Sequence, residues 1–556
     1  MHTIDVPYLI VGAGPVGLTA AHLFAAADQP CLVVERRDGP QRHPAAHVVN
    51  ARTLEIFRQA GIDMEAVHAL ANPPADAGHV NFVTRLNGEL IGRLPFERQG
   101  PEVFEVTPTP LRNISQHRLE PLLAAAAADT STIDLRYGHE WLTSEQDHDG
   151  VTSTIRNRAT GEEFNVRSTY VLAADGAGSR VRKSLGIDMI GPPSLQSFIA
   201  IHFAATELRP LIADRLGVLH FVMDPAVSGT FIAHDLDHEW VFMTAFDPEN
   251  ESVDDFDHER AATIVHEAIG ADHVDIDIVS VGSWHMSAQV AQRMRDGRIF
   301  LMGDAAHRFP PTGGLGLNTG VADAQGLVWR LNAIAEGWAD PTILETYEVE
   351  RRPVAGVNCE QSMTNAFKLA TLIEALGIPS DPTSEGVLAR LADPAHTASI
   401  AAAVQEQQTH FDMLGLQLGY CYADGALARD GDPPAPITDP SDFAPHADVG
   451  ARLPHAWLDD GRSTLDLVDG GAMTLFSLGE HDKWAASLGD TDTPVRHVRV
   501  GIDAIPGESW ASECRVRPDG ALLVRPDQHV AWRSDSIASP GPAGVGAALD
   551  QILRTH

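Results

Sequence analysis

The first residues that could do chemistry form a glycine-rich turn suited to binding a pyrophosphate. A short apolar run leads into Gly12-Ala13-Gly14-Pro15-Val16-Gly17, which has the G-x-G-x-x-G spacing. Gly12 permits a tight turn, Gly14 lets the backbone approach a pyrophosphate, and Gly17 lets a helix pack closely on a strand. Pro15 suits an early helical position, where its missing N–H costs no hydrogen bond.

An acidic residue at a suitable distance supports the same ligand. The apolar run Cys31 to Val34 ends in Glu35, eighteen residues after Gly17, where dinucleotide folds place a carboxylate on the ribose hydroxyls. The helix after the turn would face the phosphates with free N–H groups and the positive end of its dipole. Strand, turn, helix and acid together predict dinucleotide binding, and we include Val16 and Arg36 among the cofactor-binding residues.

Two later segments could complete such a site. An apolar strand at 170–174 ends in Asp175-Gly176, and another at 299–302 ends in Gly303-Asp304. The chain then reads R-F-P-P-T-G-G-L-G-L-N over 308–318. Because glycine has no Cβ, the backbone of this loop could lie very close to a ligand.

The elements that must position these segments predict an α/β protein with a Rossmann-type domain. Strand patterns near 190–290 indicate a separate, mainly-β insertion, and a stretch rich in Pro, Asp and Gly indicates a linker. We expect a cofactor domain at 1–190 and 290–360, a β-sheet substrate domain at 190–290 with a contribution from about 75–110, helices at 361–423, a linker at 424–446 and a small α/β domain at 447–556.

Composition narrows the class of protein further. A formal net charge of −36 over 556 residues argues against nucleic-acid and anionic-membrane partners. The four cysteines lie far apart without a C-x-x-C, so we expect neither disulfides nor a metal site. There is no signal-peptide pattern and no run of eighteen apolar residues. These features predict a cytoplasmic protein that does not enter a membrane.

The three segments in this order resemble the group A flavoprotein monooxygenases, the para-hydroxybenzoate hydroxylase-like family. Gln116, in I-S-Q-H-R-L-E-P-L-L, matches another flavin-contacting position of that family. The segments P-A-A-H-V-V-N-A-R-T-L-E-I-F-R at 44–58 and H-F-D-M-L-G-L-Q-L-G-Y at 410–420 look like its phenol 2-monooxygenase and dichlorophenol hydroxylase branch. Residues 461–466 and 525–533 are similar to the thioredoxin-like C-terminal domain of that branch, which lacks redox cysteines.

The resemblance implies that the bound dinucleotide is FAD and that NADPH or NADH is a transient co-substrate. In the family pattern, Asp304 contacts the ribityl chain and Glu35 binds the adenosine ribose. Asp175 and Gly176 look like the motif that this family shares between FAD and NAD(P)H. The sequence does not distinguish NADH from NADPH.

The loop after Asp304 would hold the reacting ring of the flavin. Pro311, Gly314 and Gly316 look like the part of the loop that lies against the isoalloxazine. Leu317 and Asn318 would offer N–H groups at a helix N-terminus to the flavin pyrimidine edge, where negative charge gathers on reduction.

The implied reaction is hydroxylation of a phenolic substrate by O2 and NAD(P)H through a flavin C4a-hydroperoxide. Some group must accept or orient the phenol proton, because a phenol is mostly neutral at pH 7. His47 is our candidate for that role or for flavin positioning; an ordinary loop histidine is the plain alternative. Many relatives carry Pro-Arg-Ala where this chain has Ala45, so that cation is either lost or supplied by Arg42, Arg52 or Arg180.

The resemblance also implies a homo-oligomer, a dimer or higher, with the C-terminal domain in packing and oligomer contacts. Two other enzyme classes lack their required residues. None of the six tyrosines has a lysine four positions later, as short-chain dehydrogenases require, and no G-x-S-x-G is present. A flavin-dependent oxidase or reductase without oxygen insertion, and a non-catalytic flavin-binding protein, stay as alternatives on the same scaffold.

Overall fold

The apolar run that precedes the glycine turn forms the middle of the main sheet. The computed structural model describes residues 2–507, 509–538 and 544–553. The main sheet has the order β18-β19-β10-β1-β2-β7, in which β19, β10, β1, β2 and β7 run parallel, and β8 and β9 extend it through β10. Its strands are β1 (Thr3–Val11), β2 (Cys31–Val34), β7 (Ile133–Arg136), β8 (His139–Gln146), β9 (Val151–Asn157), β10 (Glu163–Ala173), β18 (Arg295–Asp296) and β19 (Ile299–Leu301).

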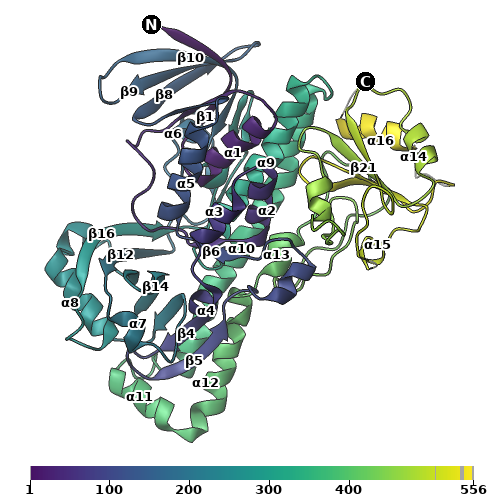
Figure 1. Ribbon diagram of the computed structural model, residues 1–556. Coiled ribbons are helices and arrows are strands. Elements are labelled where there is room, and N and C mark those ends of the chain that lie inside the picture. The colour runs from purple at the N-terminus through teal and green to yellow at the C-terminus, as the bar shows by residue number, and fades with distance from the viewer. Residues whose placement is uncertain (1, 508, 539–543, 554–556) are drawn as a thin grey trace.

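Helices cover this sheet and complete the main domain. α9 is buried along most of its length and packs against α1, which also contacts α5. A helix that is apolar nearly all round belongs in a core, and α9 crosses the centre of the molecule in Figure 1. The helices here are α1 (Pro15–Ala26), α2 (Ala51–Gln59), α3 (Met64–Ala69), α5 (Gln116–Ala128), α6 (Arg180–Ser184), α9 (Leu315–Ala335) and α10 (Glu345–Ala375).

A second, seven-stranded sheet forms a separate layer at the lower left of Figure 1. Its order is β16-β12-β15-β14-β13-β4-β5, so β4 and β5 join strands from much later in the chain. One face packs on α8 (His258–Ile269) and α7 (Leu208–Leu211). The strands are β4 (His79–Val83), β5 (Leu90–Pro95), β12 (Gln196–Ala204), β13 (Leu219–Val222), β14 (Gly229–Asp235), β15 (Glu239–Ala245) and β16 (Asp277–Met286).

Alternation along these strands separates a core face from a face turned toward the main domain. Phe203, Phe231 and Phe242 are fully buried in the core under α8. On the other face, Ala200 and Thr230 lie opposite Met243 in register, and all three are partly accessible. The insertion therefore offers a half-exposed sheet face to the rest of the molecule.

Short elements connect the two sheets. β3 (Val48–Val49) pairs with β6 (Arg112–Asn113), and β11 (Met189–Ile190), β17 (Gln289–Ala291) and β20 (His307–Arg308) form a small sheet at the base of the insertion. Helices below and beside the second sheet are α4 (Pro74–Ala77), α11 (Ser384–Ala392) and α12 (Pro394–Glu406), whereas α13 (Leu414–Leu418) contacts α2.

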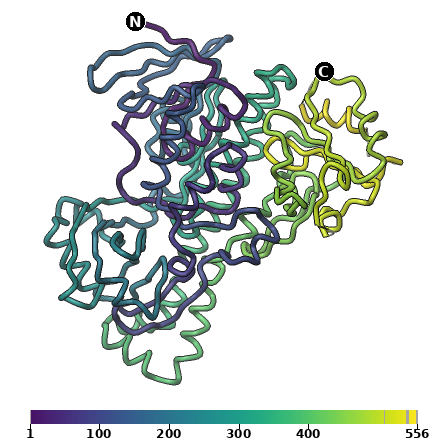
Figure 2. Tube along the Cα trace, in the orientation of Figure 1, coloured from purple at the N-terminus to yellow at the C-terminus, as the bar shows by residue number. Residues whose placement is uncertain are grey.

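The C-terminal domain lies to the right in Figures 1 and 2 and packs on α9. Trp329 and Ala333 of α9 share one apolar core with Leu475 and Trp484 of this domain. Its sheet has the order β22-β21-β23-β24. The elements are β21 (Met473–Ser477), β22 (Val495–Arg499), β23 (Ala521–Val524), β24 (Val530–Ser534), α14 (His481–Ser487), α15 (Trp510–Glu513) and α16 (Gly544–Leu553).

None of the helices described is both long and apolar enough to cross a membrane. Likewise, residues 2–507, 509–538 and 544–553 contain no group of three or more His, Cys, Asp or Glu placed to hold a metal ion.

Candidate active site

Three cofactor segments follow three adjacent parallel strands. The glycine turn, Asp175 and Asp304 come after β1, β10 and β19, and Glu35 comes after β2 on the other side of β1. Ligands of open parallel sheets bind at this carboxyl edge. The structure therefore gathers all four at one edge. The strand ends are in register across the sheet: Val34, Val11, Ala173 and Leu301.

The glycines of the site fall into two kinds. A Cβ on Gly12, which has φ 107°, would lie 2.3 Å from Ala174 O, and one on Gly17 would lie 2.0 Å from Gly12 O. These two allow close backbone packing. A Cβ on Gly14 or Gly316 would meet no described atom within 4 Å. The backbone at those two positions faces open space that a ligand can enter.

Pro15 and Val16, the other two residues assigned to the cofactor in this turn, contribute to its packing. Pro15 begins α1, as its fixed φ favours. The Val16 side chain points at α9 and the preceding loop, where a Cβ on Gly320 would lie 2.6 Å from it and one on Gly303 3.1 Å. Val16 therefore packs the turn against α9 and remains partly accessible.

Glu35 lies in a polar network at the carboxyl end of β2. Its carboxylate accepts hydrogen bonds from Ala13 N–H at 3.0 Å and from Arg37 N–H at 2.8 Å. The Arg37 guanidinium also pairs with Glu120 at 2.8 Å, and Gln116 at the start of α5 donates to Glu120 at 3.2 Å. This network joins Gln116 to Glu35.

The arginine expected at the cofactor differs from the one that makes the contacts. Arg36 is exposed, and its carbonyl accepts a hydrogen bond from Arg158 at 2.6 Å. Arg37, one position later, carries the ion pairs. Successive side chains in an extended chain point to opposite sides, so Arg36 and Arg37 point in different directions after β2.

Asp175 and Asp304 differ in what already satisfies them. The Asp175 carboxylate accepts hydrogen bonds from Ser179 Oγ at 2.5 Å and from two N–H groups at the start of α6, so it caps that helix. Asp304 is accessible, and no donor among the described residues forms a hydrogen bond with its carboxylate. Surrounding protein raises its pKa by desolvation. An accessible carboxylate without a described partner can accept hydrogen bonds from ligand donors such as hydroxyls.

The loop after Asp304 is fixed to β3. Gly314 has φ 63°, its N–H donates to Pro311 O at 3.0 Å, and a Cβ there would lie 2.6 Å from Val48. The Asn318 side chain donates to Val48 O at 3.0 Å and accepts from Asn50 N–H at 2.9 Å. Asn318 therefore ties the loop to β3, while the N–H groups at 315–317 begin α9 beside it.

His47 immediately precedes β3 and so lies next to that loop. Its Nδ1 is 3.2 Å from Asn113 Oδ1, and its ring centroid is 6.4 Å from that of Phe96 and 5.8 Å from that of His234. Burial lowers the pKa of His47 to about 4. At neutral pH it is therefore a neutral imidazole whose free ring nitrogen can accept a hydrogen bond.

Arg42, Arg52 and Arg180, which could supply the cation missing at Ala45, lie in different surroundings. Arg52 is fully buried and bonds Glu55 and Gln528 on the side of the C-terminal domain, so it cannot serve the flavin. Arg180 is exposed and paired with Glu140, and Arg42 is exposed. Only the last two can still reach a nucleotide without breaking a buried pair.

These features fit an FAD. A long dinucleotide with a flat ring requires open backbone at both ends of its site, a free carboxylate between them and a free helix N-terminus. Gly14, Gly316, Asp304 and the start of α9 provide these features. Comparison with known proteins agrees. Residues 5–362 match the FAD binding domain family and residues 446–555 match the family called aromatic-ring hydroxylase, C-terminal. The chain belongs to the FAD-dependent aromatic-ring hydroxylases.

Relatives of this hydroxylase align over almost the whole chain. A putative polyketide hydroxylase from Streptomyces halstedii is 32% identical over 97% of this chain and 94% of its own. The 2,4-dichlorophenol 6-monooxygenase of Delftia acidovorans is 30% identical over 100% and 99%. The flavin-dependent monooxygenase PieE, solved with FAD and substrate, is 36% identical over 99% of both chains with a TM-score of 0.93.

These findings make the chain an FAD-dependent monooxygenase that hydroxylates an aromatic ring, and they do not favour an oxidase. The fold class and the resemblance seen in the sequence are confirmed. The structure also places polar residues near the cofactor segments and the flavin loop that the sequence motifs did not mark: Arg37, Glu97, Glu120 and His234. Only Arg37, beside an assigned position, had a sequence signal.

Proposed function

We propose that this hydroxylase acts on a phenolic ring, with O2 and NADPH or NADH as co-substrates, and that FAD lies along the row from Glu35 to Asn318. The names of relatives that act on phenols support the substrate class: phenol 2-monooxygenase, 2,4-dichlorophenol 6-monooxygenase and 4-methyl-5-nitrocatechol 5-monooxygenase. The observation that carries the proposal is His47, a neutral imidazole placed beside both the flavin loop and the accessible sheet face.

FAD would be held by different groups along its length. Glu35 and the open backbone at Gly14 would take the adenosine and pyrophosphate, and Asp304 would accept hydrogen bonds from the ribityl hydroxyls. Pro311, Gly314 and Gly316 would leave room for the ring, with N–H groups of Leu317 and Asn318 at its pyrimidine edge. When bound and reduced by NAD(P)H, FAD supplies the activation of O2 for insertion into the aromatic ring.

The substrate would lie between that loop and the second sheet. Partly accessible apolar side chains on the facing side of the sheet, Ala200, Leu219, Phe221 and Met243, provide a water-poor surface for an aromatic ring. With Asn113 Oδ1 as acceptor, His47 carries its proton on Nδ1 and presents the Nε2 lone pair. His47 would accept a hydrogen bond from the phenol hydroxyl and orient its proton, which makes the ring more nucleophilic.

The proposal also covers the domains, the assembly, the location and the role of one motif. We assign the domain boundaries given by the sequence: cofactor, β-sheet, helical, linker and thioredoxin-like parts. We assign a homo-oligomer and a cytoplasmic location; the four cysteines, all unpaired, support the second. Asp175 and Gly176 would serve FAD and NAD(P)H jointly.

The test combines turnover with cofactor content. Purified protein is given NADPH or NADH and a panel of simple, chlorinated and multi-ring phenols. We expect some phenols to stimulate NAD(P)H oxidation and to gain one oxygen by mass. Oxidation with hydrogen peroxide and no hydroxylated product across the panel contradicts the phenol assignment. Asp304→Ala should lose bound FAD, whereas the surface control Asp149→Ala should stay yellow; a fully loaded Asp304→Ala contradicts the assignment of the third segment.

A further inference from the structure

The outward face of α10 is apolar and open to solvent. Val349, Val357 and Phe367 on this helix are 47%, 49% and 63% exposed. Pro353 and Met363 lie on the same face, because residues three or four positions apart on a helix are neighbours. We call this face, from Val349 to Phe367, the α10 stripe; it is about 27 Å long at 1.5 Å per residue. A contiguous apolar surface of this kind marks an interaction site.

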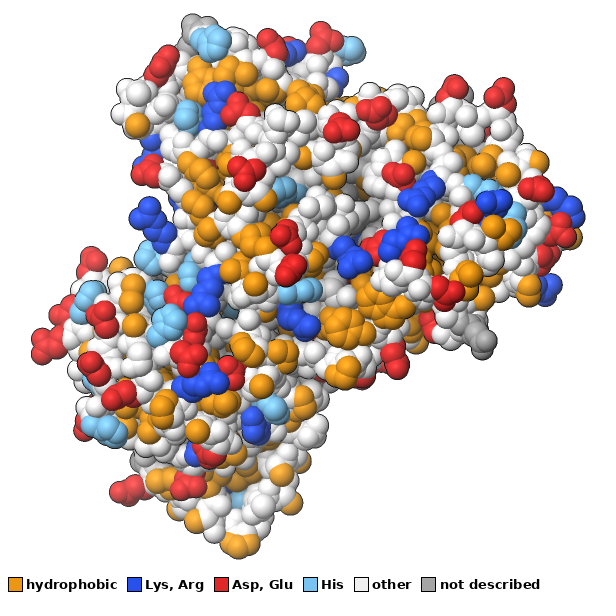
Figure 3. All heavy atoms as spheres, viewed as in Figure 1, with side chains coloured by type: hydrophobic (Ala, Val, Ile, Leu, Met, Phe, Trp, Pro, Cys, Tyr) orange, Lys and Arg blue, Asp and Glu red, His pale blue; other side chains and the backbone are white. Residues whose placement is uncertain are grey.

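The α10 stripe carries little of the negative charge of this protein. The chain has a formal net charge of −36, and acidic side chains are spread over all parts of the face shown in Figure 3. Between residues 349 and 367 the acids are Glu360, which is exposed, and Glu350, which is buried. Two copies of so acidic a protein repel each other over most of their surfaces. The stripe is therefore a face on which they can meet at low electrostatic cost.

Arg352 and Glu360 have opposite charges that the chain itself leaves unpaired. Arg352 donates from Nε to Ala291 O at 3.1 Å, and neither side chain forms an ion pair with any residue that the structure describes. They are eight residues apart, about 12 Å along the helix, which is too far for them to pair with each other. In two antiparallel α10 helices related by a two-fold axis, each Arg352 comes near the Glu360 of the other copy. Parallel helices would instead bring like charges together.

Gly356 lies midway between these two charges. Beyond its own turns of the helix, a Cβ at this position would meet no described atom within 4 Å, so packing inside the chain does not call for a glycine there. Glycine also weakens a helix interior compared with alanine. Where two helices cross, however, a glycine lets their backbones approach closely. Crossing at Gly356 also brings Val349 of one copy toward Met363 of the other, because each lies seven residues from the glycine.

A second copy fits the stripe better than any segment of the same chain. Within residues 1–556, the runs outside the description are at most five residues long, and five extended residues span about 18 Å at most. Beside the N-terminal half of α10, β17 packs against the helix and pairs with β11, where Ile190 is 54% exposed. This strand adds apolar area next to the stripe, which suits a partner as broad as another copy of the chain.

We propose that the α10 stripe is the docking surface for a second copy of this chain, with the two α10 helices antiparallel and crossing at Gly356. Two contacts between Arg352 and Glu360, one on each side of the two-fold axis, then flank an apolar contact centred on the glycine. This inference rests on the proposed homo-oligomer and gives it a surface and an arrangement.

The test exchanges the two charges separately and together. FAD-loaded protein is examined by sedimentation velocity over micromolar concentrations, where we expect the unaltered protein to be a dimer. Glu360→Arg and Arg352→Glu each place like charges opposite one another and should raise the dimer dissociation constant at least about 10-fold. An equal mixture of the two variants restores opposite charges at both contacts, so it should form a mixed dimer with close to the unaltered affinity. The double variant, Arg352→Glu with Glu360→Arg, should dimerise as well.

Substitution of apolar residues provides a matched control. Val357→Asp puts a charge into the stripe and should give monomers, whereas Ile502→Asp, at a residue 59% exposed on the C-terminal domain, should leave the dimer intact. Bound FAD and the circular dichroism spectrum check that each variant is folded. A dimer that persists in Glu360→Arg and Val357→Asp, or single variants that do not dimerise when mixed, overturns this surface and arrangement alone. An unaltered protein that is monomeric throughout overturns the proposed homo-oligomer as well, whereas the hydroxylation of phenols is tested independently of both.

Discussion

At the scale of single residues, Glu97 combines two unfavourable features beside the flavin loop. Its backbone φ is 53°, and its carboxylate is buried, accepting hydrogen bonds from Met413 N–H at 3.1 Å and Gln417 Nε2 at 3.0 Å. Met413 in turn fills the space next to Gly313. Positive φ in a non-glycine residue persists where its surroundings impose it, often near functional sites. Glu97 therefore supports the packing behind the flavin loop.

Glu97 should make stability depend on pH. Burial raises its pKa to about 8, from 4.5 in the unfolded chain. The folded state then binds more protons between these values, so the free energy of unfolding falls as pH rises through that window, by up to about 1.4 kcal/mol per pH unit. Glu97→Gln keeps an acceptor for both donors and should remove this slope. Thermal melts from pH 5 to 8 measure it; parallel slopes for the two proteins contradict the prediction.

Residues that follow a strand directly were the ones that sequence could place. Glu35 and Asp304 come at the end of apolar runs, so their position at the sheet edge follows from the chain itself. His234 and Glu97 gain their surroundings from elements far away in sequence, and no local pattern marks them. The roles given to His47 and to the other site residues stay predictions until the experiments above are done.

At the scale of elements, α9 links the flavin loop to the core. Asp323 on this helix accepts hydrogen bonds from Gly303 N–H at 3.1 Å and His307 Nε2 at 2.7 Å, and it pairs with Arg351 at 2.9 Å. Burial opposes its ionisation, but His307 and Arg351 outweigh burial and lower its pKa. One buried carboxylate thus holds both ends of the Asp304 segment.

Asp323→Asn should loosen that segment and release FAD. The amide keeps one acceptor atom and leaves the buried Arg351 without a counter-charge, which typically costs about 3–5 kcal/mol. We expect a lower melting temperature and, well below it, reduced FAD occupancy, measured by absorbance after gel filtration. Glu336→Gln removes a carboxylate from the exposed end of the same helix and should change neither. Full FAD occupancy in Asp323→Asn would show that the segment does not need this anchor.

Element boundaries were predictable where one pattern governed them. The helix N-terminus expected at Leu317 and Asn318 is that of α9, which begins two residues earlier, at Leu315. The strand expected at 170–174 is the end of a longer strand, β10. Along one edge it pairs antiparallel with β9 and then parallel with β19, and along the other edge it pairs parallel with β1. No local pattern reveals a strand that changes partners.

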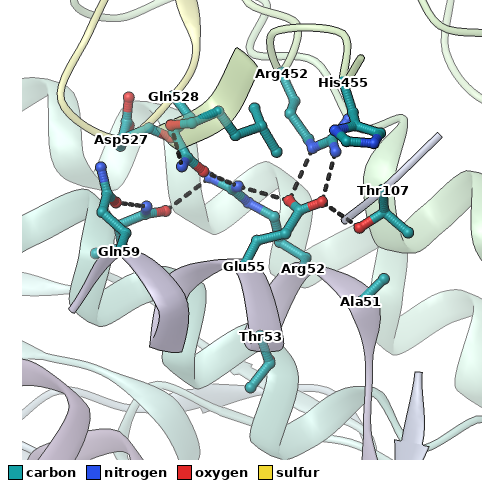
Figure 4. Close-up of polar contacts among 12 residues, drawn as sticks. Ala51, Arg52, Thr53, Glu55, Gln59, Thr107, Arg452, His455, Asp527 and Gln528 are labelled. Carbon is teal, nitrogen blue, oxygen red and sulfur yellow. Dashed lines mark hydrogen bonds and ion pairs between the residues drawn. The ribbon is translucent and has the colours of Figure 1, made fainter. Parts of the chain in front are cut away.

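At the scale of the whole molecule, buried ion pairs fasten the C-terminal domain to the main domain. Figure 4 shows Arg52 and Glu55 of α2 facing Arg452, with Gln528 and Thr107 at the sides. Arg452 bonds both Glu55 oxygens at 2.8 and 2.5 Å, and Glu55 is only 1% exposed. A second buried cluster joins Arg525 to Glu350 at 2.7 Å. A protein with net charge −36 thus places cations where its two domains meet.

The strength of this junction depends on burial more than on the number of ion pairs. Arg58, one turn along α2 from Glu55, forms a similar two-bond pair with Asp466 of the C-terminal domain at 2.6 and 2.7 Å. That pair is partly open to water, with side chains 35% and 19% exposed, and it borders a cavity of about 230 Å³ between the domains. Water screens such a pair and can replace it, whereas nothing replaces a partner in a dry interface.

Arg452→Met and Arg58→Met therefore form a matched pair of variants. Arg452→Met leaves the Glu55 carboxylate with one fewer buried cation and should cost about 3–5 kcal/mol in the free energy of unfolding. Arg58→Met should cost at most about 1 kcal/mol, because its pair is exposed. Urea unfolding followed by tryptophan fluorescence measures both, since Trp484, Trp510 and Trp532 report on the C-terminal domain. Equal losses in the two variants would mean that the apolar core shared with α9, and not the buried ion pairs, decides how firmly the domain is docked.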